Sequence, residues 1–217
     1  MNRKLVAFTA LAGVGALCTA FIAASDSIDV VPYSAAQVLG RPAPNFTLAD
    51  ANGRNVSLAD FRGRTVVLEW NNPQCPFTRK HYDSGNMQRT QAAAAQAGVV
   101  WLTINSSGPG KQGHVNAAGA RAYLSSSRAT PAHYLLDPAG QVGRLYDART
   151  TPHMFVINGA GTLVYAGAID DRPTANPEDV QGARNHVLAA LADVRAGRAV
   201  SVPTSRPYGC SVKYADG

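Results

Sequence analysis

The stretch that decides the fold reads VVLEWNNPQCPFTRKH and runs from Val66 to His81. Its apolar, β-branched first part, which ends at Trp70, predicts a buried strand. A short Asn/Pro loop follows, and then come a single cysteine, Cys75, and directly after it Pro76. Because proline is favoured at the first position of a helix, we expect a helix to begin at Pro76. Cys75 would then lie at a helix N-terminus, where free backbone N–H groups and the helix dipole favour a thiolate.

Outward from this stretch, the sequence pattern alternates between strands and helices. We expect strands at 45–48, 56–58, 65–70, 99–104, 134–136, 153–158 and 162–167, and helices at 76–97, 114–125, 140–146 and 177–196. Asn52-Gly53 predicts a hairpin between the first two strands, and Gly85 predicts an irregularity in the first helix. Alternating strands and helices favour a largely parallel sheet covered on both faces, to which the last hairpin adds antiparallel strands.

The first 25 residues differ from the rest of the chain. Arg3 and Lys4 precede an apolar run from Leu5 to Ala24, which predicts an export signal peptide. The run is also just long enough to span a bilayer, so an uncleaved N-terminal membrane anchor is the alternative. We therefore divide the chain into this leader (1–25), a linker (26–37), one domain (38–196) and a C-terminal tail (197–217). The expected location is the periplasm, either free or anchored to the membrane and facing the periplasm.

Charge and motifs exclude several classes of function. The leader holds two basic residues and no acidic one, so without it the net charge falls from +6 to +4. The basic residues are scattered and form no Lys/Arg block, which gives no support to nucleic-acid binding. The sequence also has no Gly-x-Ser-x-Gly motif and no phosphate-binding loop, which gives no support to a serine hydrolase or a nucleotide-binding enzyme.

Cysteine usage points to redox chemistry. Of the three cysteines, Cys18 lies in the leader, which leaves Cys75 and Cys210. In an oxidising compartment, paired cysteines persist as disulfides. The two residues could form a structural disulfide that ties down the tail, or they could work as a redox pair. The position of Cys75 at a helix start favours the redox pair.

Several separate motifs resemble one family. Thr150-Thr151-Pro152 lies directly before the strand expected at 153–158, where a proline is a candidate for a cis peptide bond. Together with a cysteine at a strand-to-helix turn, this pattern resembles the thioredoxin fold. The opening GRPAPNFTL at 40–48 and LADFRG at 58–63 resemble the alkyl hydroperoxide reductase/thiol-specific antioxidant (redoxin) family. The runs TTPHMFVI at 150–157, LVYAGAIDDRP at 163–173 and PYGCSVKY at 207–214 are similar to a peroxiredoxin-like subgroup of it.

The resemblance implies a fold and a reactive site. The fold would be α/β and thioredoxin-like, with a central mixed sheet, helices on both faces and an N-terminal β-hairpin extension. Cys75-Pro76 matches the reactive cysteine of the family, and Pro152 matches the cis-proline that faces it. Thr151 would offer backbone groups to a bound thiol substrate, and Cys210 becomes the candidate resolving cysteine.

The implied function is that of an exported thiol-dependent oxidoreductase. Cys75 would act as redox nucleophile on a small peroxide or a protein disulfide, and a thiol or disulfide electron donor would restore it. No cofactor is expected. The membrane would be a partner only through an uncleaved N-terminal anchor.

The chain departs from the family at three positions. Thr78 stands where Cys-x-x-Cys reductases have their second cysteine, and Asn72 stands where typical peroxiredoxins have threonine. Those peroxiredoxins also have an arginine on the strand where this chain has Thr151-Pro152. Arg149 and Arg79 are the candidates to replace it. A local dithiol is absent, so the partner of the reactive cysteine is either distant in the sequence or an outside thiol.

Other side chains are candidates for supporting roles. Arg79 and Lys80, in the first turns of the helix, could lower the pKa of the Cys75 thiol. Glu69 lies near the end of the preceding strand and is a candidate proton acceptor under the active site.

Two other functions stay open on the sequence. The first is a non-catalytic thioredoxin-fold binding module in which Cys75 and Cys210 form a structural disulfide. The second is a copper site made from Cys75, His81 and His153. The five histidines follow no fixed metal-binding spacing, so we expect no metal.

Overall fold

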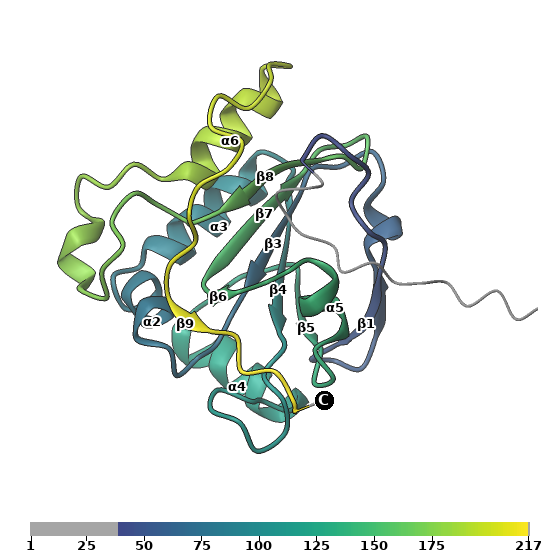
Figure 1. Cartoon of the computed structure of the whole chain (residues 1–217), viewed down its shortest axis with the longest axis vertical. Coiled ribbons are helices and arrows are strands. Elements are labelled where there is room, and N and C mark those ends of the chain that lie inside the picture. The colour runs from purple at the N-terminus through teal and green to yellow at the C-terminus, as the bar shows by residue number, and fades with distance from the viewer. Residues whose placement is uncertain (1–38, 217) are drawn as a thin grey trace, which may run out of the picture. The chain divides into compact units, whose positions relative to one another are not determined.

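A seven-stranded sheet is the centre of the chain in this computed structural model, which describes residues 39–216 (Figure 1). Its strands lie in the order β2-β1-β5-β4-β3-β7-β8. They are β1 (Thr47–Asp50), β2 (Asn55–Ser57), β3 (Val66–Trp70), β4 (Val100–Asn105), β5 (His133–Leu136), β7 (His153–Ile157) and β8 (Leu163–Gly167). Strands β3, β4 and β5 run parallel, and the other pairings are antiparallel. The predicted mixed sheet and the β1–β2 hairpin are thus confirmed. The leader and the linker predicted at 1–37 lie outside the described residues.

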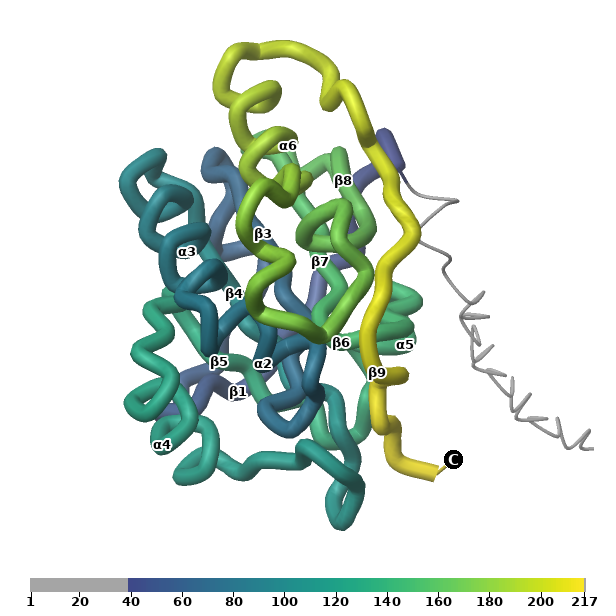
Figure 2. The backbone as a smooth tube through the Cα atoms, turned by 90° about the vertical axis from the view of Figure 1, so that its left-hand side faces the viewer, coloured from purple at the N-terminus to yellow at the C-terminus, as the bar shows by residue number. Residues whose placement is uncertain are grey.

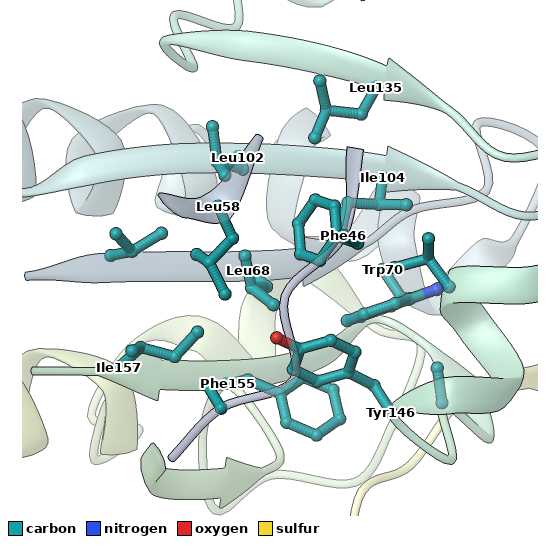
Figure 3. Close-up of a cluster of buried hydrophobic side chains, with 14 of the residues drawn as sticks. Phe46, Leu58, Leu68, Trp70, Leu102, Ile104, Leu135, Tyr146, Phe155 and Ile157 are labelled. Atoms are coloured by element: carbon teal, nitrogen blue, oxygen red, sulfur yellow. The ribbon is translucent and has the colours of Figure 1, made fainter. Parts of the chain in front are cut away.

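Helices cover both faces of the sheet, as predicted. They are α2 (Pro76–Asp83), α3 (Asn86–Gln96), α4 (Ala117–Ser127), α5 (Gln141–Leu145) and α6 (His186–Arg195), with the 3-10 turns η1 (Leu58–Phe61) and η2 (Pro177–Val180). Because strand side chains alternate between faces, Leu68 and Trp70 pack with η1 and α5 in one core cluster (Figure 3). Val67, one position away, packs on the opposite face with apolar residues of α2, α3 and α6. No helix within residues 39–216 has the length and apolar character needed to cross a membrane.

Two of the predicted helices are interrupted. Gly85 has a φ of 73° and separates α2 from α3, so the helix expected at 76–97 is two helices. The prediction of a single helix at 177–196 is wrong. The chain leaves η2 through Gly182, which has a φ of 76°, and α6 begins only after Asn185, whose side chain accepts from the Leu188 N–H at 2.9 Å. Leu188, in the first turn of α6, is 37 % exposed.

The C-terminal tail returns to the start of α2, where the Cys210 N–H donates to Cys75 Sγ. Figure 2 shows this yellow segment running from the end of α6 past β8 and β6 towards α5. Its strand β9 (Cys210–Ser211) pairs antiparallel with β6 (Thr150–Thr151). Just beyond, the Val212 N–H donates to the Arg149 carbonyl at 3.0 Å. The sequence predicts no strand in this tail, because a two-residue strand has no periodicity to detect.

Candidate active site

Cys75 is the N-cap residue of α2, and Pro76 is the first residue of that helix. The preceding loop is held by Asn72, whose side chain is fully buried. The Asn72 carbonyl accepts from the Cys75 N–H at 3.0 Å, and its Oδ1 accepts from the Gln74 N–H at 2.8 Å. Its Nδ2 donates to Gln112 Oε1 at 2.9 Å. These bonds fix the turn that brings the sulfur to the start of the helix.

The Thr151–Pro152 peptide bond is cis, and it lies directly against the cysteine. The Cys75 thiol donates to the Thr151 carbonyl, with Sγ and O 3.0 Å apart. Thr151 is also the register partner of Cys210 in the β6–β9 pair. The Cys210 N–H donates to Cys75 Sγ at 3.4 Å. The structure therefore brings together four of the predicted site residues, Cys75, Thr151, Pro152 and Cys210, with the sulfur of Cys75 fully buried among them.

The two thiols are free and differ in acidity. Burial raises the pKa of Cys75, but hydrogen bonds from the Cys210 thiol, the Thr151 side chain and the Thr78 N–H outweigh it and lower that pKa below its ordinary value. Burial, together with the hydrogen bond to Cys75, raises the pKa of Cys210 to about 12. Cys75 is therefore the residue of the pair that ionises, while Cys210 keeps its proton.

The two candidate arginines have exposed side chains that pair with acidic residues. Arg79 pairs with Asp83, with Nε and Oδ2 3.5 Å apart, and Arg149 pairs with Asp147, with Nη2 and Oδ2 2.6 Å apart. Neither guanidinium contacts Cys75 within residues 39–216, and neither is among the groups that lower its pKa most. Acidic neighbours on the surface hold both side chains, and the replacement of the peroxiredoxin arginine by one of them stays a prediction.

Thr78 and Glu69 are both buried, but only the Glu69 side chain forms hydrogen bonds among the described residues. The backbone N–H of Thr78 faces the Cys75 sulfur, while its Oγ1 is buried and has no hydrogen-bond partner among the described residues. Glu69 accepts from Tyr82 Oη at 2.8 Å and Trp101 Nε1 at 2.9 Å. It also accepts from Thr103 Oγ1, Asn71 Nδ2 and Gln91 Nε2. Burial raises its pKa. None of these bonds reaches Cys75, so a proton transfer between Glu69 and Cys75 has no direct route.

The two histidines considered for a metal are engaged elsewhere. His81 Nε2 is 3.1 Å from the Tyr208 hydroxyl, and His153 Nδ1 accepts from the Arg149 N–H at 3.3 Å. Burial lowers the pKa of His81 to about 4 and that of His153 to about 3. In the part of the chain that the structure describes, no three His, Cys, Asp or Glu side chains gather closely enough to hold a metal ion.

Sequence reasoning missed a buried polar cluster behind the active site, formed by Lys80, His81, Asp170 and Tyr208. Lys80 was expected next to the thiol, but its Nζ lies 3.7 Å from Asp170 Oδ2 instead. The available signal was Tyr208, which stands two residues before Cys210 in the tail motif.

A family model for the AhpC/TSA family matches residues 39–166 of the chain. Thiol-disulfide oxidoreductase ResA of Bacillus subtilis is 26 % identical over 132 residues, which are 58 % of this chain and 64 % of ResA. Putative peroxiredoxin Rv2521 of Mycobacterium tuberculosis is 66 % identical over only 29 residues, which are 13 % of this chain and 18 % of that protein. The chain thus covers less than two thirds of the length of either relative.

Solved structures with the same fold cover most of the chain. A hypothetical protein, SMc02350 from Sinorhizobium meliloti, aligns with a TM-score of 0.69 and 25 % identity over 83 % of this chain and 96 % of its own. An uncharacterized conserved protein from Geobacillus kaustophilus aligns with a TM-score of 0.70 and 25 % identity, over 82 % and 93 %. A putative thiol:disulfide interchange protein DsbE from Chlorobium tepidum gives 0.51 and 26 %, over 66 % and 93 %.

Proposed function

The chain belongs to the AhpC/TSA family and has a thioredoxin-like fold, and on this premise we propose that it is a thiol-disulfide oxidoreductase. Cys75 is the nucleophile of the proposed reaction, and Cys210 is the resolving cysteine. One observation carries the proposal. The Cys210 N–H lies 3.4 Å from Cys75 Sγ, although 135 positions separate the two residues in the sequence.

The proposed reaction starts at the Cys75 thiolate. It attacks one sulfur of a substrate disulfide, which forms a mixed disulfide and releases the other sulfur as a thiolate that takes up a proton. Cys210 then loses its proton and attacks Cys75 Sγ. This step forms the Cys75–Cys210 disulfide and releases the second substrate thiol. The substrate gains two electrons, the protein dithiol loses two, and an outside thiol donor reduces the protein again.

The likeness to ResA and to the DsbE protein supports a disulfide as the substrate. The pairing of both candidate arginines with acidic side chains also weighs against a peroxide, because these pairs compete for the guanidinium groups that would bind it. A peroxide is nevertheless the second candidate, since 29 residues match a putative peroxiredoxin at 66 % identity. With a peroxide, Cys75 would become a sulfenic acid, and Cys210 would displace water from it.

Access to Cys75 requires the tail to move. The sulfur is fully buried, and strand β9 lies over it, so a protein disulfide cannot reach it while β9 is paired. A cavity of 590 Å³, lined in part by Thr150, Tyr208 and Gly209, lies beside the tail and leaves space for it to shift. The leader predicted at 1–25 and the oxidising compartment that it implies complete the proposal, with the periplasm as the place of action.

The proposal is tested by comparing wild type with the Cys75→Ser and Cys210→Ser variants in the reduction of a model protein disulfide and in peroxide consumption. Cys75→Ser should abolish the disulfide reaction, whereas Cys210→Ser should trap a mixed disulfide on Cys75, seen by mass spectrometry of the non-reduced protein. The second candidate would be established if the wild-type protein consumed peroxide but reduced no disulfide, and if Cys75→Ser abolished the peroxide consumption.

The redox potential of the Cys75–Cys210 disulfide distinguishes the proposed enzyme from a non-catalytic binding module. A structural disulfide has a potential below about −300 mV and resists the glutathione pool, whereas a working pair has a higher potential. If glutathione cannot reduce the Cys75–Cys210 disulfide and no variant changes either activity, the proposed enzyme is excluded.

A further inference from the structure

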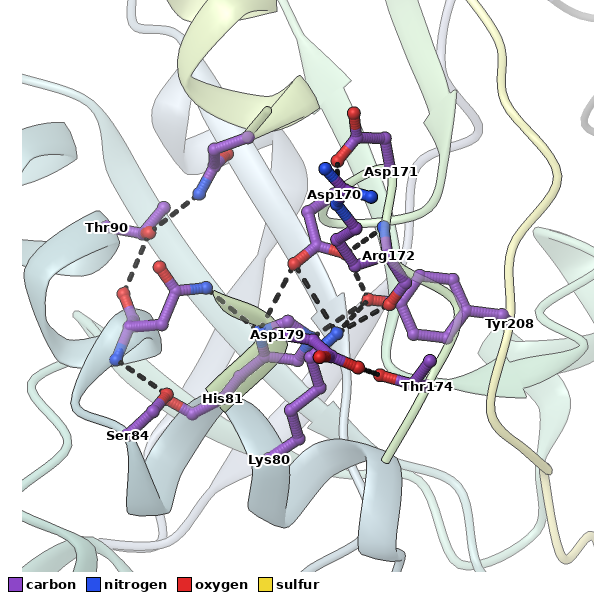
Figure 4. Close-up of polar contacts among 12 residues, drawn as sticks. Lys80, His81, Ser84, Thr90, Asp170, Asp171, Arg172, Thr174, Asp179 and Tyr208 are labelled. Carbon is purple, nitrogen blue, oxygen red and sulfur yellow. Dashed lines mark hydrogen bonds and ion pairs between the residues drawn. The ribbon is translucent and has the colours of Figure 1, made fainter. Parts of the chain in front are cut away.

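The hydroxyl of Tyr208 ties the tail to helix α2 through a buried polar cluster (Figure 4). It donates to the Asp170 carboxylate and accepts from Lys80 Nζ at 3.4 Å. A phenol has one proton, so His81 Nε2, 3.1 Å away, must be the donor in its contact with Tyr208. His81 Nδ1 then accepts from Asn86 Nδ2 at 2.9 Å. Each donor of the cluster therefore meets an acceptor when the tail lies in this position.

Three members of this cluster are deeply buried, although two of them carry charged groups, while Tyr208 is half-buried. Lys80, His81 and Asp170 are each at most 2 % exposed. Buried charges are costly to desolvate, and an apolar set of similar size is often equally or more stable. Asp170 Oδ2 also has no hydrogen bond among the described residues, although Lys80 Nζ lies 3.7 Å from it. Such a cluster is therefore poorly explained by stability alone and better explained by the specific placement of a segment.

The cluster and the reactive cysteine are carried by the same helix. Cys75 caps the start of α2, and Lys80 and His81 follow in its next turns. On the tail, Tyr208 precedes Cys210 by two residues, and its ring packs against Phe77 with centroids 6.0 Å apart. The helix thus contacts the tail at two points, once through the cysteines and once through the phenol.

The register of the tail decides which residue faces the sulfur. In an extended chain, residues two apart point to the same side, and a slip of one residue turns every side chain to the other side. A slip would place Gly209 or Ser211, which have no thiol, where Cys210 now lies. The β6–β9 pair contains only two register partners, Thr150–Ser211 and Thr151–Cys210, so it fixes the register weakly by itself.

From these observations we infer that Tyr208 is a positioning residue that sets the register of the tail, so that Cys210 docks against Cys75 and resolves the mixed disulfide. The inference rests on the proposed function. It assigns to Tyr208 a role in the second step of the reaction, in which the tail docks again over Cys75.

The test follows the reaction with oxidised glutathione. Cys75 attacks it, forms a Cys75–glutathione disulfide and releases one glutathione thiol; Cys210 then displaces the second glutathione and forms the Cys75–Cys210 disulfide. A glutathione bound to Cys75 occupies the space over the sulfur, so closure requires the tail to dock again. Acid-quenched samples analysed by mass spectrometry separate the dithiol, the glutathione adduct and the internal disulfide.

The Tyr208→Phe variant keeps the ring on Phe77 and removes only the hydroxyl. Closure of the adduct should slow by about tenfold, which is the size expected for a lost hydrogen bond to a charged group. The attack of added free cysteine on the same adduct should not slow, so the effective concentration of Cys210 at Cys75 falls by about tenfold. A merely structural role would leave this ratio unchanged.

The matched control is Tyr146→Phe. It removes another phenol hydroxyl, which donates to the Pro44 carbonyl at 2.6 Å in the core cluster on the other face of the sheet. Closure at the wild-type rate is expected there. Equal slowing in both variants would overturn the inference.

A second variant keeps the inference testable if Tyr208→Phe does not fold. His81→Phe removes one donor to the phenol and leaves the Asp170–Lys80 pair intact, so closure should slow in the same direction by a smaller factor. The inference is overturned if the wild-type protein closes its disulfide and the variants that fold close it equally fast. If the wild-type protein forms neither adduct nor disulfide, the proposed function itself fails.

Discussion

Thr151 and Cys210 are direct register partners in an antiparallel strand pair, with the cis bond to Pro152 on one side and the glycine before Cys210 on the other. This pairing places the second cysteine over the first. The Thr151 carbonyl accepts from the Cys75 thiol at 3.0 Å, while the chain at Cys210 donates its N–H to the same sulfur at 3.4 Å. One residue therefore contacts both cysteines, and the proposed reaction requires the tail to leave the site.

Gly209→Ala should force the tail off Thr151. A Cβ at Gly209 would lie 2.1 Å from the Thr151 carbonyl oxygen, and the φ of 138° is unfavourable for alanine. We expect alkylation of Cys75 by iodoacetamide at pH 7 to become at least about tenfold faster, since strain of about 1–2 kcal/mol shifts the tail towards the open state.

The matched control for this change is Gly197→Ala. Gly197 also has a left-handed φ, 67°, but no other atom of residues 39–216 lies within 4 Å of the position of its Cβ. Cys75 should stay protected in this variant. Unchanged protection in Gly209→Ala would show that the tail does not shield the sulfur.

The alkylation rate of Cys75 should report its lowered pKa. The rate follows the thiolate, so its midpoint on the pH axis should lie below the ordinary value of 9.0. In Cys210→Ala, the hydrogen bond from the second thiol is lost, and the midpoint should move up.

The same shift makes the stability of the reduced protein depend on pH. Between the folded pKa of Cys75 and 9.0, the unfolded chain binds more protons, so the free energy of unfolding rises with pH in this window. Above 9.0, Cys210 acts in the opposite direction, because its folded pKa is about 12 and the folded state then holds more protons. Urea unfolding with Cys210→Ala should show a smaller rise, because the hydrogen bond from the second thiol is lost, and a smaller fall just above 9.0.

Thr78→Val should stabilise the reduced protein. The Thr78 hydroxyl is buried and has no hydrogen-bond partner in residues 39–216, so valine removes an uncompensated polar group at nearly the same size. A gain of about 1 kcal/mol in the free energy of unfolding is expected. Thr103→Val is the control, since Thr103 is equally buried but donates to Glu69 at 3.0 Å. That variant should lose stability, and a loss in both variants would mean that Thr78 is satisfied.

Glu69→Gln should weaken the fold and leave the thiol unchanged. The carboxylate accepts from five side chains, and an amide would direct its own N–H groups at some of these donors, at a cost of about 2–3 kcal/mol. The melting temperature should fall, while the midpoint of Cys75 alkylation should stay in place. A shift of that midpoint would restore Glu69 as the proton acceptor considered from the sequence.

The pH dependence due to Glu69 has the opposite sign to that of Cys75. Burial raises its pKa above 4.5, so the folded state holds its proton to higher pH than the unfolded chain does. Its contribution to stability is complete at low pH and is lost as pH rises from 4.5 through the folded pKa. Glu69→Gln should remove this slope, which is measured by urea unfolding at several pH values in that range.

Local sequence patterns determined most of the fold. The apolar run before Cys75, the proline after it and the Asn52-Gly53 turn each act over a few residues, so the strand, the helix start and the hairpin could be predicted correctly. The prediction of one long helix at 177–196 was wrong because it also rested on a local pattern. The apolar spacing of this segment is helical. The helical conformation nevertheless stops before Gly182, which has a positive φ, and resumes only after the N-cap residue Asn185.

From the sequence alone, it could be predicted that a cysteine lies at a helix start and that a proline precedes the hairpin strand, because both depend on neighbouring residues. The surroundings of that cysteine depend instead on how distant segments pack together. The meeting of Cys75 with Cys210, the pairing of both arginines with acidic side chains and the burial of Lys80 beside Asp170 and Tyr208 involve residues up to 135 positions apart. Such contacts are set by how elements pack, since a two-residue strand or a single buried charge has no periodic pattern from which its partner could be predicted.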